Sequence, residues 1–332
     1  MRVFRDQDID PELIRGRRVA VIGYGNQGRA QALNLRDSGV PVTVGLPEAS
    51  ASRARAAADG FDVMTAAEAA ADAQLAVMLA ADEDQARIYR DEIEPNLRQG
   101  AALCFAHGLN VHFGLIAPRG DLDVFLVAPK GPGTALRSEY EAGRGLIALF
   151  AAHQDATGEA EALALSYGAA LGSGRAGMLR TSFAEDCEAD LFNEQAVLWG
   201  AIPELIYAGY ETLVDAGFSP EVAYFECLTE VKLIADLIYA RGIAGMREAI
   251  SNTAEFGALK GATRIVNQDT RTEMRRILRE VRSGLFVEDL LADARNGYSQ
   301  LKESRQAAAQ HPIEAVGQKL RELGRSASTK AE

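Results

Sequence analysis

Hydrophobic residues follow one spacing in the first half of the chain and another in the second half. From Arg18 to about Phe150, short apolar runs rich in β-branched residues alternate with alanine-rich stretches of helical character. The apolar runs are VAVIG, VPVTVG, AQLAVML, AALCFAH and LDVFLVAPKG. This alternation is typical of parallel strands joined by crossover helices. We therefore predict an α/β domain over residues 1–181.

The second half has a helical pattern throughout. After about Ser182, segments such as FNEQAVLWGAIPELIYAGYETLVDAG place apolar residues three and four positions apart, with only brief Gly or Pro interruptions. This spacing predicts amphipathic helices. We predict an all-α domain over residues 182–327. The last residues, 328–332, are small and polar, and we expect them to be a frayed tail.

Composition narrows the class of protein. The 332 residues are 48% hydrophobic and 25% charged, which are the proportions of a globular protein. Cys104, Cys187 and Cys227 are odd in number and far apart, which fits neither a disulfide framework nor a CxxC metal site and favours a reducing compartment. No run approaches the roughly 18 apolar residues of a membrane span. We expect a cytoplasmic protein with no membrane partner.

The negative charge is concentrated in one stretch. The net charge is -12, and the sixty residues from Thr181 to Ala240 hold twelve acids and one base, Lys232. Nucleic-acid binding requires a basic field, so this distribution argues against it. It favours a cation as the partner.

A glycine-rich segment follows the first apolar run. In VAVIGYGNQGRAQA, Gly23, Gly25 and Gly28 have the GxGxxG spacing, with a predicted strand before them and a predicted helix after them. The first glycine permits a tight turn, the second lets the backbone approach a pyrophosphate, and the third lets helix and strand pack closely. The context on both sides favours a dinucleotide site over a glycine turn with no ligand.

The end of the second strand bears on the choice of cofactor. In VTVGLPEASASR, Ser50, Ser52 and Arg53 could hold the 2'-phosphate of NADPH, whereas Glu48 could hold the ribose hydroxyls of NADH. Pro47 offers no donor. We predict that NADPH is favoured modestly and that NADH is also possible.

Two pairs of acids are spaced one helical turn apart. Asp190 and Glu194 form the first pair, and Glu226 and Glu230 form the second pair. Each pair has apolar neighbours, so we expect the carboxylates to lie on or beside a buried face, where they would be costly without a cation. Hard oxygen ligands with no histidine nearby favour Mg²⁺, and two pairs can hold two ions. A single such pair is more often a solvated face, and we interpret the remaining acids of the stretch in that way.

Taken together, these segments resemble ketol-acid reductoisomerases of the short class over nearly the whole chain. The matching segments, in chain order, are GYGNQG, MLAADEDQ, FAHGLNVHFG, VAPKGPG, DLFNEQ, AYFECLTE, ISNTAEFG and HPIEAVG. The resemblance implies a Rossmann domain followed by a knotted helical domain, with NAD(P)H and two Mg²⁺ as cofactors. It also implies a homodimer or larger homo-oligomer whose active sites are shared between chains. Such enzymes convert 2-acetolactate or 2-aceto-2-hydroxybutyrate to 2,3-dihydroxy-3-methyl acids in branched-chain amino-acid synthesis.

The resemblance also assigns roles to residues at the matching positions. Asp190 would bridge both ions and Glu194 would bind one of them. Glu226 and Glu230 would serve the second ion and the substrate from the partner chain, which makes Glu230 a catalytic residue as well as a ligand. Ser251 would contact the substrate carboxylate.

Two strand ends supply further candidates. Lys130 in VAPKGPG would steady the migrating oxygen chemistry, and His107 in CFAHG would have a supporting role near the metals or cofactor. The residues expected at the cofactor are Gly23, Tyr24, Gly25, Asn26, Gln27, Gly28, Ser50, Ser52, Asp82, Glu83, Asp84, Gln85 and Gly133.

Several neighbours of these residues depart from the usual family pattern. They are Pro47, Thr134, Asn193, Trp199, Pro203 and Thr229. A second hypothesis is therefore a homologous enzyme of a specialised pathway that acts on a different keto acid. A third is a catalytically silent nucleotide-binding dimer module, which the retained acids argue against.

Overall fold

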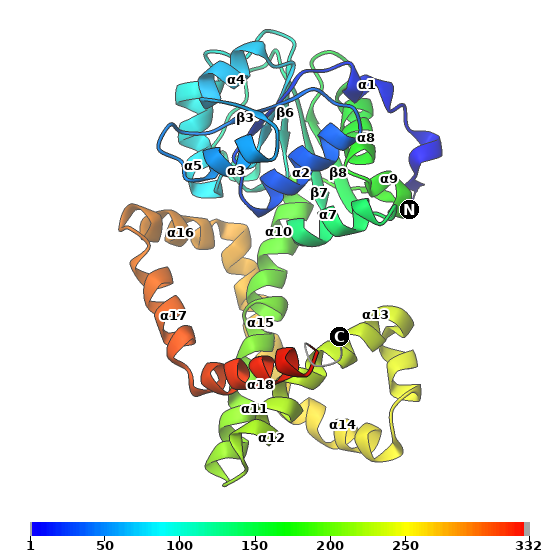
Figure 1. Cartoon of the computed structure of the whole chain (residues 1–332), viewed down its shortest axis with the longest axis vertical. Helices are drawn as coiled ribbons and strands as arrows, with labels where there is room; N and C mark the ends of the chain where they lie inside the picture. The colour runs from blue at the N-terminus through cyan, green and yellow to red at the C-terminus, as the bar shows by residue number, and fades with distance from the viewer. Residues whose placement is uncertain (1, 329–332) are drawn as a thin grey trace. The chain divides into compact units, whose positions relative to one another are not determined.

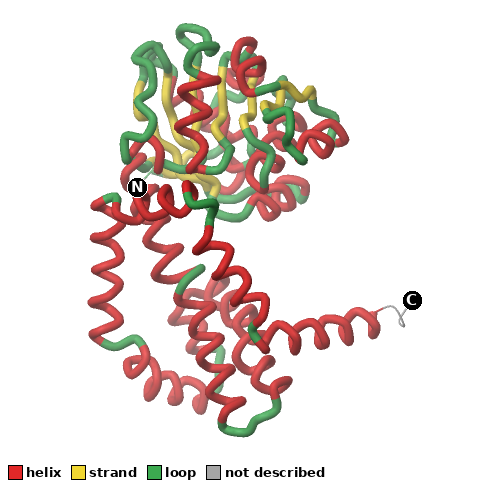
Figure 2. Tube along the Cα trace, turned by 90° about the vertical axis from the view of Figure 1, so that its left-hand side faces the viewer, coloured by secondary structure: helices red, strands yellow, loops and turns green. Residues whose placement is uncertain are grey.

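The computed structural model describes residues 2–328. The chain divides into two compact units, Met1–Ala189 and Asp190–Glu332. Among the described residues all strands (yellow in Figure 2) belong to the first unit, and the second is built from helices and their connecting turns. Apart from Ser328, the last residue of a helix, the tail predicted over 328–332 lies outside the described residues.

The first unit is built on one sheet with the order β1-β9-β8-β7-β6-β5-β2-β3-β4. The strands in chain order are β1 (Val3–Phe4), β2 (Val19–Ile22), β3 (Val42–Gly45), β4 (Asp62–Met64), β5 (Leu75–Met78), β6 (Ala102–Phe105), β7 (Asp123–Pro129), β8 (Ala148–Gln154) and β9 (Met178–Arg180). The six strands from β2 to β7 pair in parallel. The five predicted strands are β2, β3, β5, β6 and β7, so the predicted parallel α/β fold is confirmed.

The structure adds strands that the pattern did not predict. β4 is three residues long and exposed at both ends, and β1 has only two residues, so neither has a recognisable apolar run. β8 runs antiparallel to β7, and β1 runs antiparallel to β9. The sheet is therefore mixed at this edge rather than parallel throughout.

Helices connect and cover the strands (Figure 1). In the first unit they are η1 (Asp6–Asp8), α1 (Glu12–Arg15), α2 (Asn26–Asp37), α3 (Ser52–Ala58), α4 (Ala66–Asp72), α5 (Asp82–Ile88), η2 (Tyr89–Ile93), α6 (Leu109–His112), α7 (Gly133–Glu141), α8 (Ala160–Ala170), α9 (Ser173–Ala176) and α10 (Phe183–Asn193), which continues into the second unit.

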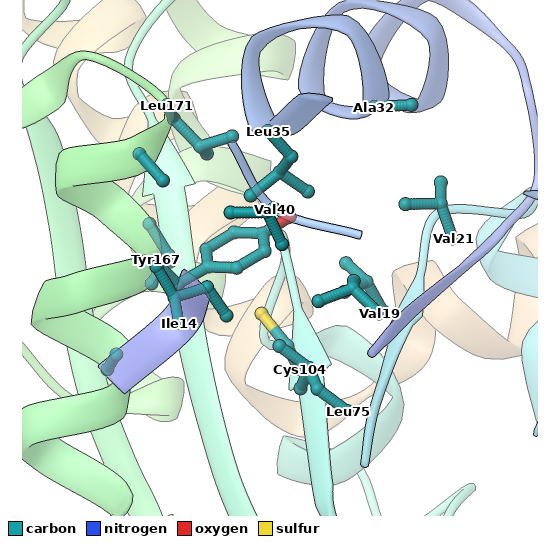
Figure 3. Packing of buried hydrophobic residues seen from close by; sticks show 14 of the residues in the cluster. Ile14, Val19, Val21, Ala32, Leu35, Val40, Leu75, Cys104, Tyr167 and Leu171 are labelled. Carbon is teal, nitrogen blue, oxygen red and sulfur yellow. The ribbon is translucent and has the colours of Figure 1, made fainter. Parts of the chain in front are cut away.

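Alternate residues of the strands enter two separate cores. On β2, Val19 and Val21 belong to one cluster, and Ala20 and Ile22 belong to the other. Side chains alternate across a strand, so the sheet is buried on both faces, as a parallel sheet requires. Figure 3 shows the first cluster, in which side chains of α1, α2 and α8 meet those of the central strands around Tyr167.

The order of the strands creates a switch point. After β2 the chain builds β3 and β4 on one side, then crosses to build β5, β6 and β7 on the other side. In such sheets, ligands bind outside the carboxyl ends of the strands where the order reverses. Here that position is at the ends of β2 and β5.

The second unit consists of helices with a small core. They are η3 (Glu194–Leu198), α11 (Ala201–Asp215), α12 (Pro220–Tyr224), η4 (Phe225–Thr229), α13 (Glu230–Glu248), α14 (Asn252–Ile265), α15 (Gln268–Ser283), α16 (Leu285–Arg295), α17 (Ser299–Gln310) and α18 (Pro312–Ser328). The predicted all-helical character is confirmed. Within the described residues, a buried cluster is formed by Tyr210, Ala223, Tyr224, Ile313 and Val316, and none of the residues of α13 or α14 is buried. None of the helices in the described part of the chain is long and apolar enough to cross a membrane.

Candidate active site

The glycine loop between β2 and α2 is shaped by close backbone contacts. Gly23 has φ +107°, and a Cβ at this position would lie 2.5 Å from the Ala80 nitrogen at the end of β5. A Cβ on Gly28 would collide with the Gly23 carbonyl. At Gly25, by contrast, a Cβ would meet nothing within 4 Å, which leaves open space before the N-terminus of α2. Free N–H groups at such a helix end attract phosphate.

A small hollow of about 160 Å³ opens beside this loop. It is lined by Gly25, Asn26, Arg29, Ala30, Leu33, Arg55, Gly133, Thr134 and Arg137. Three of its residues are arginines, whose guanidinium groups suit phosphate, although Arg29 and Arg137 also form ion pairs with carboxylates. None of the three was predicted from the sequence, because each lies on a helix outside the glycine motif. Nothing in the sequence around these arginines distinguishes them from other arginines on helices.

Tyr24 was expected at the cofactor, but its side chain is used inside the fold. The ring is buried, and the hydroxyl donates a hydrogen bond of 2.8 Å to Asp59. Arg29 donates two hydrogen bonds to the same carboxylate. Burial, together with the Asp59 carboxylate, raises the pKa of Tyr24 well above its usual range. Only the backbone of Tyr24 is left to meet a ligand.

The loop after β3 is fixed by Arg53. Its guanidinium donates to the carbonyls of Leu46 at 2.8 Å, Val63 at 3.0 Å and Met64 at 3.2 Å. Because these carbonyls occupy N–H groups that were predicted to hold a phosphate, Arg53 is better described as a clamp between β3 and β4. Ser50 accepts a hydrogen bond from the Ser52 backbone, and both serines are half-buried.

The acidic segment after β5 forms the first turn of α5. Asp82, Glu83 and Asp84 occupy this turn. Gln85 is buried, and its side-chain amide donates to the Ala80 carbonyl and to Asp82, both at 3.0 Å. Gln85 therefore fixes the loop between β5 and α5 through hydrogen bonds from its buried side chain.

Two loops at the strand ends are joined directly. Gln27 of the glycine loop donates a hydrogen bond of 2.9 Å to the Gly131 carbonyl, next to Lys130. A Cβ on Gly133 would collide with the Asn26 carbonyl. The cofactor loop and the loop that carries Lys130 are thus packed backbone to backbone.

Lys130 lies immediately after β7 and makes a short ion pair. Its ammonium donates to Asp186 Oδ1 at 2.6 Å, and the Asp186 side chain has no exposed surface. The expectation that the acids outside the two pairs are solvated is therefore wrong for Asp186. It lies on the buried side of α10, and only the tertiary packing identifies it.

His107 follows β6 and is half-buried. Its Nδ1 accepts a hydrogen bond from the Leu109 backbone at 3.2 Å, which leaves Nε2 as the nitrogen that carries the proton in the neutral ring. A Cβ on the neighbouring Gly108 would collide with the Phe183 carbonyl, so α10 begins directly against this strand end.

Both predicted metal pairs lie at π-helical turns. Glu194 begins η3 and follows Asp190 of α10, whereas Glu226 lies in η4 and Glu230 begins α13. Such widened turns occur mostly as single interruptions of α-helices, frequently at functional sites. The i,i+4 spacing of the acids did not predict these π-helical turns.

The surroundings of the pairs differ from the expectation of a buried face. Asp190 and Glu194 are half-buried, but Glu226 and Glu230 are exposed. Of the apolar neighbours, Leu191 and Tyr224 are buried, whereas Val197, Phe225 and Leu233 are exposed. Among the described residues, no group of three or more His, Cys, Asp or Glu side chains lies close enough to hold a metal ion. The described part of the chain therefore offers carboxylate pairs of suitable chemistry that are not gathered into one ligand set.

Ser251 and the departures from the family pattern have varied settings. Ser251 caps α14, accepting a hydrogen bond of 3.1 Å from the Ala254 backbone, and is exposed. Thr134 lines the small hollow, and Pro203 lies in the first turn of α11. Trp199 is 70% exposed at the end of η3.

Comparison with known proteins covers both units. Residues 13–177 match the family model of the acetohydroxy acid isomeroreductase NADPH-binding domain, and residues 183–325 match that of the ketol-acid reductoisomerase C-terminal domain. A solved NADH-preferring ketol-acid reductoisomerase from an uncultured archean is 41% identical, with a TM-score of 0.94, over 97% of this chain and 99% of that chain.

More distant structures share the fold alone. A semialdehyde dehydrogenase NAD-binding protein from Cupriavidus necator is 18% identical with a TM-score of 0.60, over 80% of this chain and 99% of that chain. A pyrroline-5-carboxylate reductase from Coxiella burnetii is 14% identical with a TM-score of 0.56, over 80% of this chain and 98% of that chain. The phosphate-ready loop at the switch point, the helical unit with its carboxylate pairs and the two family matches lead to one conclusion: the chain belongs to the ketol-acid reductoisomerase family and is an NAD(P)H-dependent oxidoreductase.

Proposed function

We propose that this enzyme converts 2-acetolactate or 2-aceto-2-hydroxybutyrate to the corresponding 2,3-dihydroxy-3-methyl acid in branched-chain amino-acid biosynthesis. An alkyl group migrates between adjacent carbons, and hydride from NAD(P)H then reduces the new ketone. The observation that carries the proposal is the presence of both carboxylate pairs, each at a π-helical turn, in a chain whose first unit has a dinucleotide loop. A reductase that only transfers hydride has no need for four such acids.

Magnesium is the metal that the donor set favours. Asp190, Glu194, Glu226 and Glu230 offer only hard oxygen ligands. Two bound Mg²⁺ ions would polarise the substrate's carbonyl and hydroxyl oxygens, which favours both the migration and the reduction. Asp190 and Glu194 would hold the ions, and Glu226 and Glu230 would complete the ligand set.

Other residues of the chain orient the substrate. Lys130, at the carboxyl end of β7, donates hydrogen bonds to a substrate oxygen beside the cofactor loop. Ser251 contacts the substrate carboxylate with its hydroxyl. His107 supports the site through the Nε2–H that its Nδ1 hydrogen bond fixes.

The complete site requires a second copy of the chain. The helical unit exposes many large apolar side chains, including Tyr239 at 95% and Leu233 at 61%. A soluble monomer rarely exposes so much apolar surface. A second copy that covers these helices would bury them and bring its own carboxylates to the pair on the first chain. The knot implied by the family resemblance stays a prediction.

Both nicotinamide cofactors should serve, with NADPH used at least as well as NADH. The Ser50 and Ser52 hydroxyls and the exposed Arg55 can meet a 2'-phosphate, which supports NADPH. The occupied guanidinium of Arg53 and the acid Glu48 favour NADH, the cofactor that the 41%-identical relative is described as preferring. We expect kcat/KM values for the two within about tenfold of each other, a difference of roughly 1.4 kcal/mol. A clear preference for NADH would show that the serines contribute little.

The decisive experiment measures turnover of 2-acetolactate with each cofactor while Mg²⁺ is titrated. We expect saturable dependence on Mg²⁺. Asp190→Asn should abolish turnover and leave cofactor binding, measured by the fluorescence of the reduced nicotinamide, nearly unchanged. Preserved turnover in this variant would refute the metal assignment.

A second candidate is a family member that acts on a different 2-keto or 2-hydroxy-3-keto acid. It rests on Trp199, a large exposed side chain one turn after Glu194, which departs from the usual family pattern described above. No turnover of 2-acetolactate, together with Mg²⁺-dependent reduction of another keto acid, would favour this candidate.

A further inference from the structure

The Lys130–Asp186 pair has an unusual balance of hydrogen bonds. Asp186 Oδ1 receives the Lys130 ammonium at 2.6 Å, but Asp186 Oδ2 is buried and has no hydrogen-bond partner among the described residues. Lys130 is the more open partner, with about a third of its side chain exposed. A buried carboxylate with only one of its oxygens satisfied is costly. The pair is therefore not explained by stability alone.

The backbone around the pair is rigid on both sides. The Lys130 N–H donates to the Ile147 carbonyl at 2.8 Å, which joins the residue to β8, and Gln27 holds the next carbonyl. Asp186 lies in the first turns of α10, whose start packs directly on Gly108 after β6. With both backbones fixed, the short ion pair to Asp186 restricts where the ammonium can lie.

Asp186 also lies one helical turn before Asp190. Residues four apart share a face of a helix, so the face of α10 that receives the ammonium continues into the first metal pair. The lysine's partner and the first residue of the metal pair are thus two carboxylates of one helix, one turn apart.

We propose that Asp186 is a positioning residue that holds the Lys130 ammonium in place to donate a hydrogen bond to the oxygen that gains negative charge during alkyl migration. This inference rests on the proposed function.

In that step the migrating carbon's bond to C2 breaks and its new bond to C3 forms. The C2 hydroxyl loses its proton and becomes a ketone, while the C3 ketone oxygen becomes an alkoxide and takes up a proton. The step is an isomerisation without net oxidation or reduction. A donor held at the C3 oxygen stabilises the alkoxide only if its position is fixed beforehand.

The test compares Asp186→Asn with Asp186→Glu in the full-length enzyme. Asparagine keeps the shape and removes the charge, so we expect kcat with 2-acetolactate to fall by about 10- to 100-fold, as is typical when the supporting partner of a functional group is lost. The KM for the nicotinamide cofactor should change by less than about twofold, since the cofactor contacts are not altered. Glutamate restores the charge on a longer side chain, and we expect part of the lost kcat to return.

Asp123→Asn is the matched control. Asp123 is a buried aspartate at the opposite end of the same strand, and both of its oxygens accept hydrogen bonds from Thr157. Its loss should lower the melting temperature without lowering kcat. A double variant tests the connection to the lysine: in a Lys130→Gln background, measured by single turnover at high enzyme concentration, Asp186→Asn should cost little further rate.

The outcomes separate this inference from the proposed function. Wild-type enzyme that does not turn over 2-acetolactate would refute the function itself. An active wild type with an unchanged kcat in Asp186→Asn, or an equal loss with and without Lys130, would overturn the positioning role. If Asp186→Asn does not fold, as judged by cofactor binding, the Asp186→Glu variant decides: a kcat below wild type with normal cofactor KM supports the role, and an unchanged kcat overturns it.

Discussion

The two units of this chain are stabilised in different ways. The first buries both faces of a sheet, and its core contains large side chains with no exposed surface, such as Phe125 and Tyr167. In the described part of the second unit, a small cluster surrounds Tyr210 and Tyr224, while helices α13 and α14 have no buried residue. We therefore expect the first unit to depend less on a partner for its stability than the second.

The same difference separates the two halves of the chemistry. The cofactor loop, Lys130 and Asp186 are all assembled within the first unit. Within the residues that the structure describes, the carboxylate pairs of the second unit are not gathered into a ligand set. The site residues that contact one another thus lie in the unit with the larger core, and the carboxylate pairs lie in the unit with the smaller described core.

The largest expected effect tests whether the metal site is shared. Asp190→Asn and Glu226→Gln should each reduce kcat by about three orders of magnitude, because each removes a ligand of the catalytic ions. If the two pairs of one site come from different chains, co-expression of both variants should restore about a quarter of wild-type activity, since mixed dimers keep one intact site. The measurement is turnover of the purified mixture. No recovery would indicate that one chain supplies the whole site.

A core substitution tests the independence of the first unit. Phe125→Ala should lower the free energy of unfolding by about 3–5 kcal/mol, because the ring is fully buried beside Tyr167. Denaturant titration would measure the loss. The same loss should appear at low and at high protein concentration, and a strong dependence on concentration would show that the sheet unit also relies on a partner.

The opposite behaviour is expected for Phe256 in α14. This ring is 60% exposed in a single chain. If a second copy covers it, Phe256→Ala should cost about 1.5–3 kcal/mol of dimer stability. Unfolding curves recorded over a hundredfold range of protein concentration would show the loss as weakened association. A change within about 0.5 kcal/mol at all concentrations would mean that the ring remains in water.

The smallest effect concerns the Asp59 carboxylate that supports the cofactor loop. Hydrogen bonds from Arg29 hold the pKa of Asp59 below its usual value. Asp59→Asn should therefore cost about 1–2 kcal/mol at pH 7. A lowered pKa contributes stability above the unfolded value of about 4, and that contribution is lost as pH falls through the folded value. Unfolding at pH 7, 5 and 3 should show the wild-type advantage shrinking only below about pH 4, and an unchanged gap at pH 3 would contradict the assignment.

The sequence was informative where a local pattern had a single structural meaning. The β-branched runs gave β2, β3, β5, β6 and β7, and the glycine spacing located the turn after β2. Short exposed strands such as β4 were missed because three residues carry no periodicity.

Roles that depend on tertiary contacts could not be predicted in the same way. Arg53 resembled a phosphate ligand, but it clamps three carbonyls. Asp186 resembled a surface acid until the packing of α10 placed it against Lys130. The π-helical turns at Glu194 and Glu226 depend on backbone geometry that no residue type specifies.

Helix α10 places acids at 186 and 190, and the next acid follows at 194 where the π-helical turn begins. Each residue added to or removed from such a helix turns every later side chain by about 100°. An insertion between Asp186 and Asp190 would thus separate the lysine partner from the metal pair more thoroughly than most exchanges of side chains. Among homologous chains the number of residues in this segment should therefore vary less than their identity.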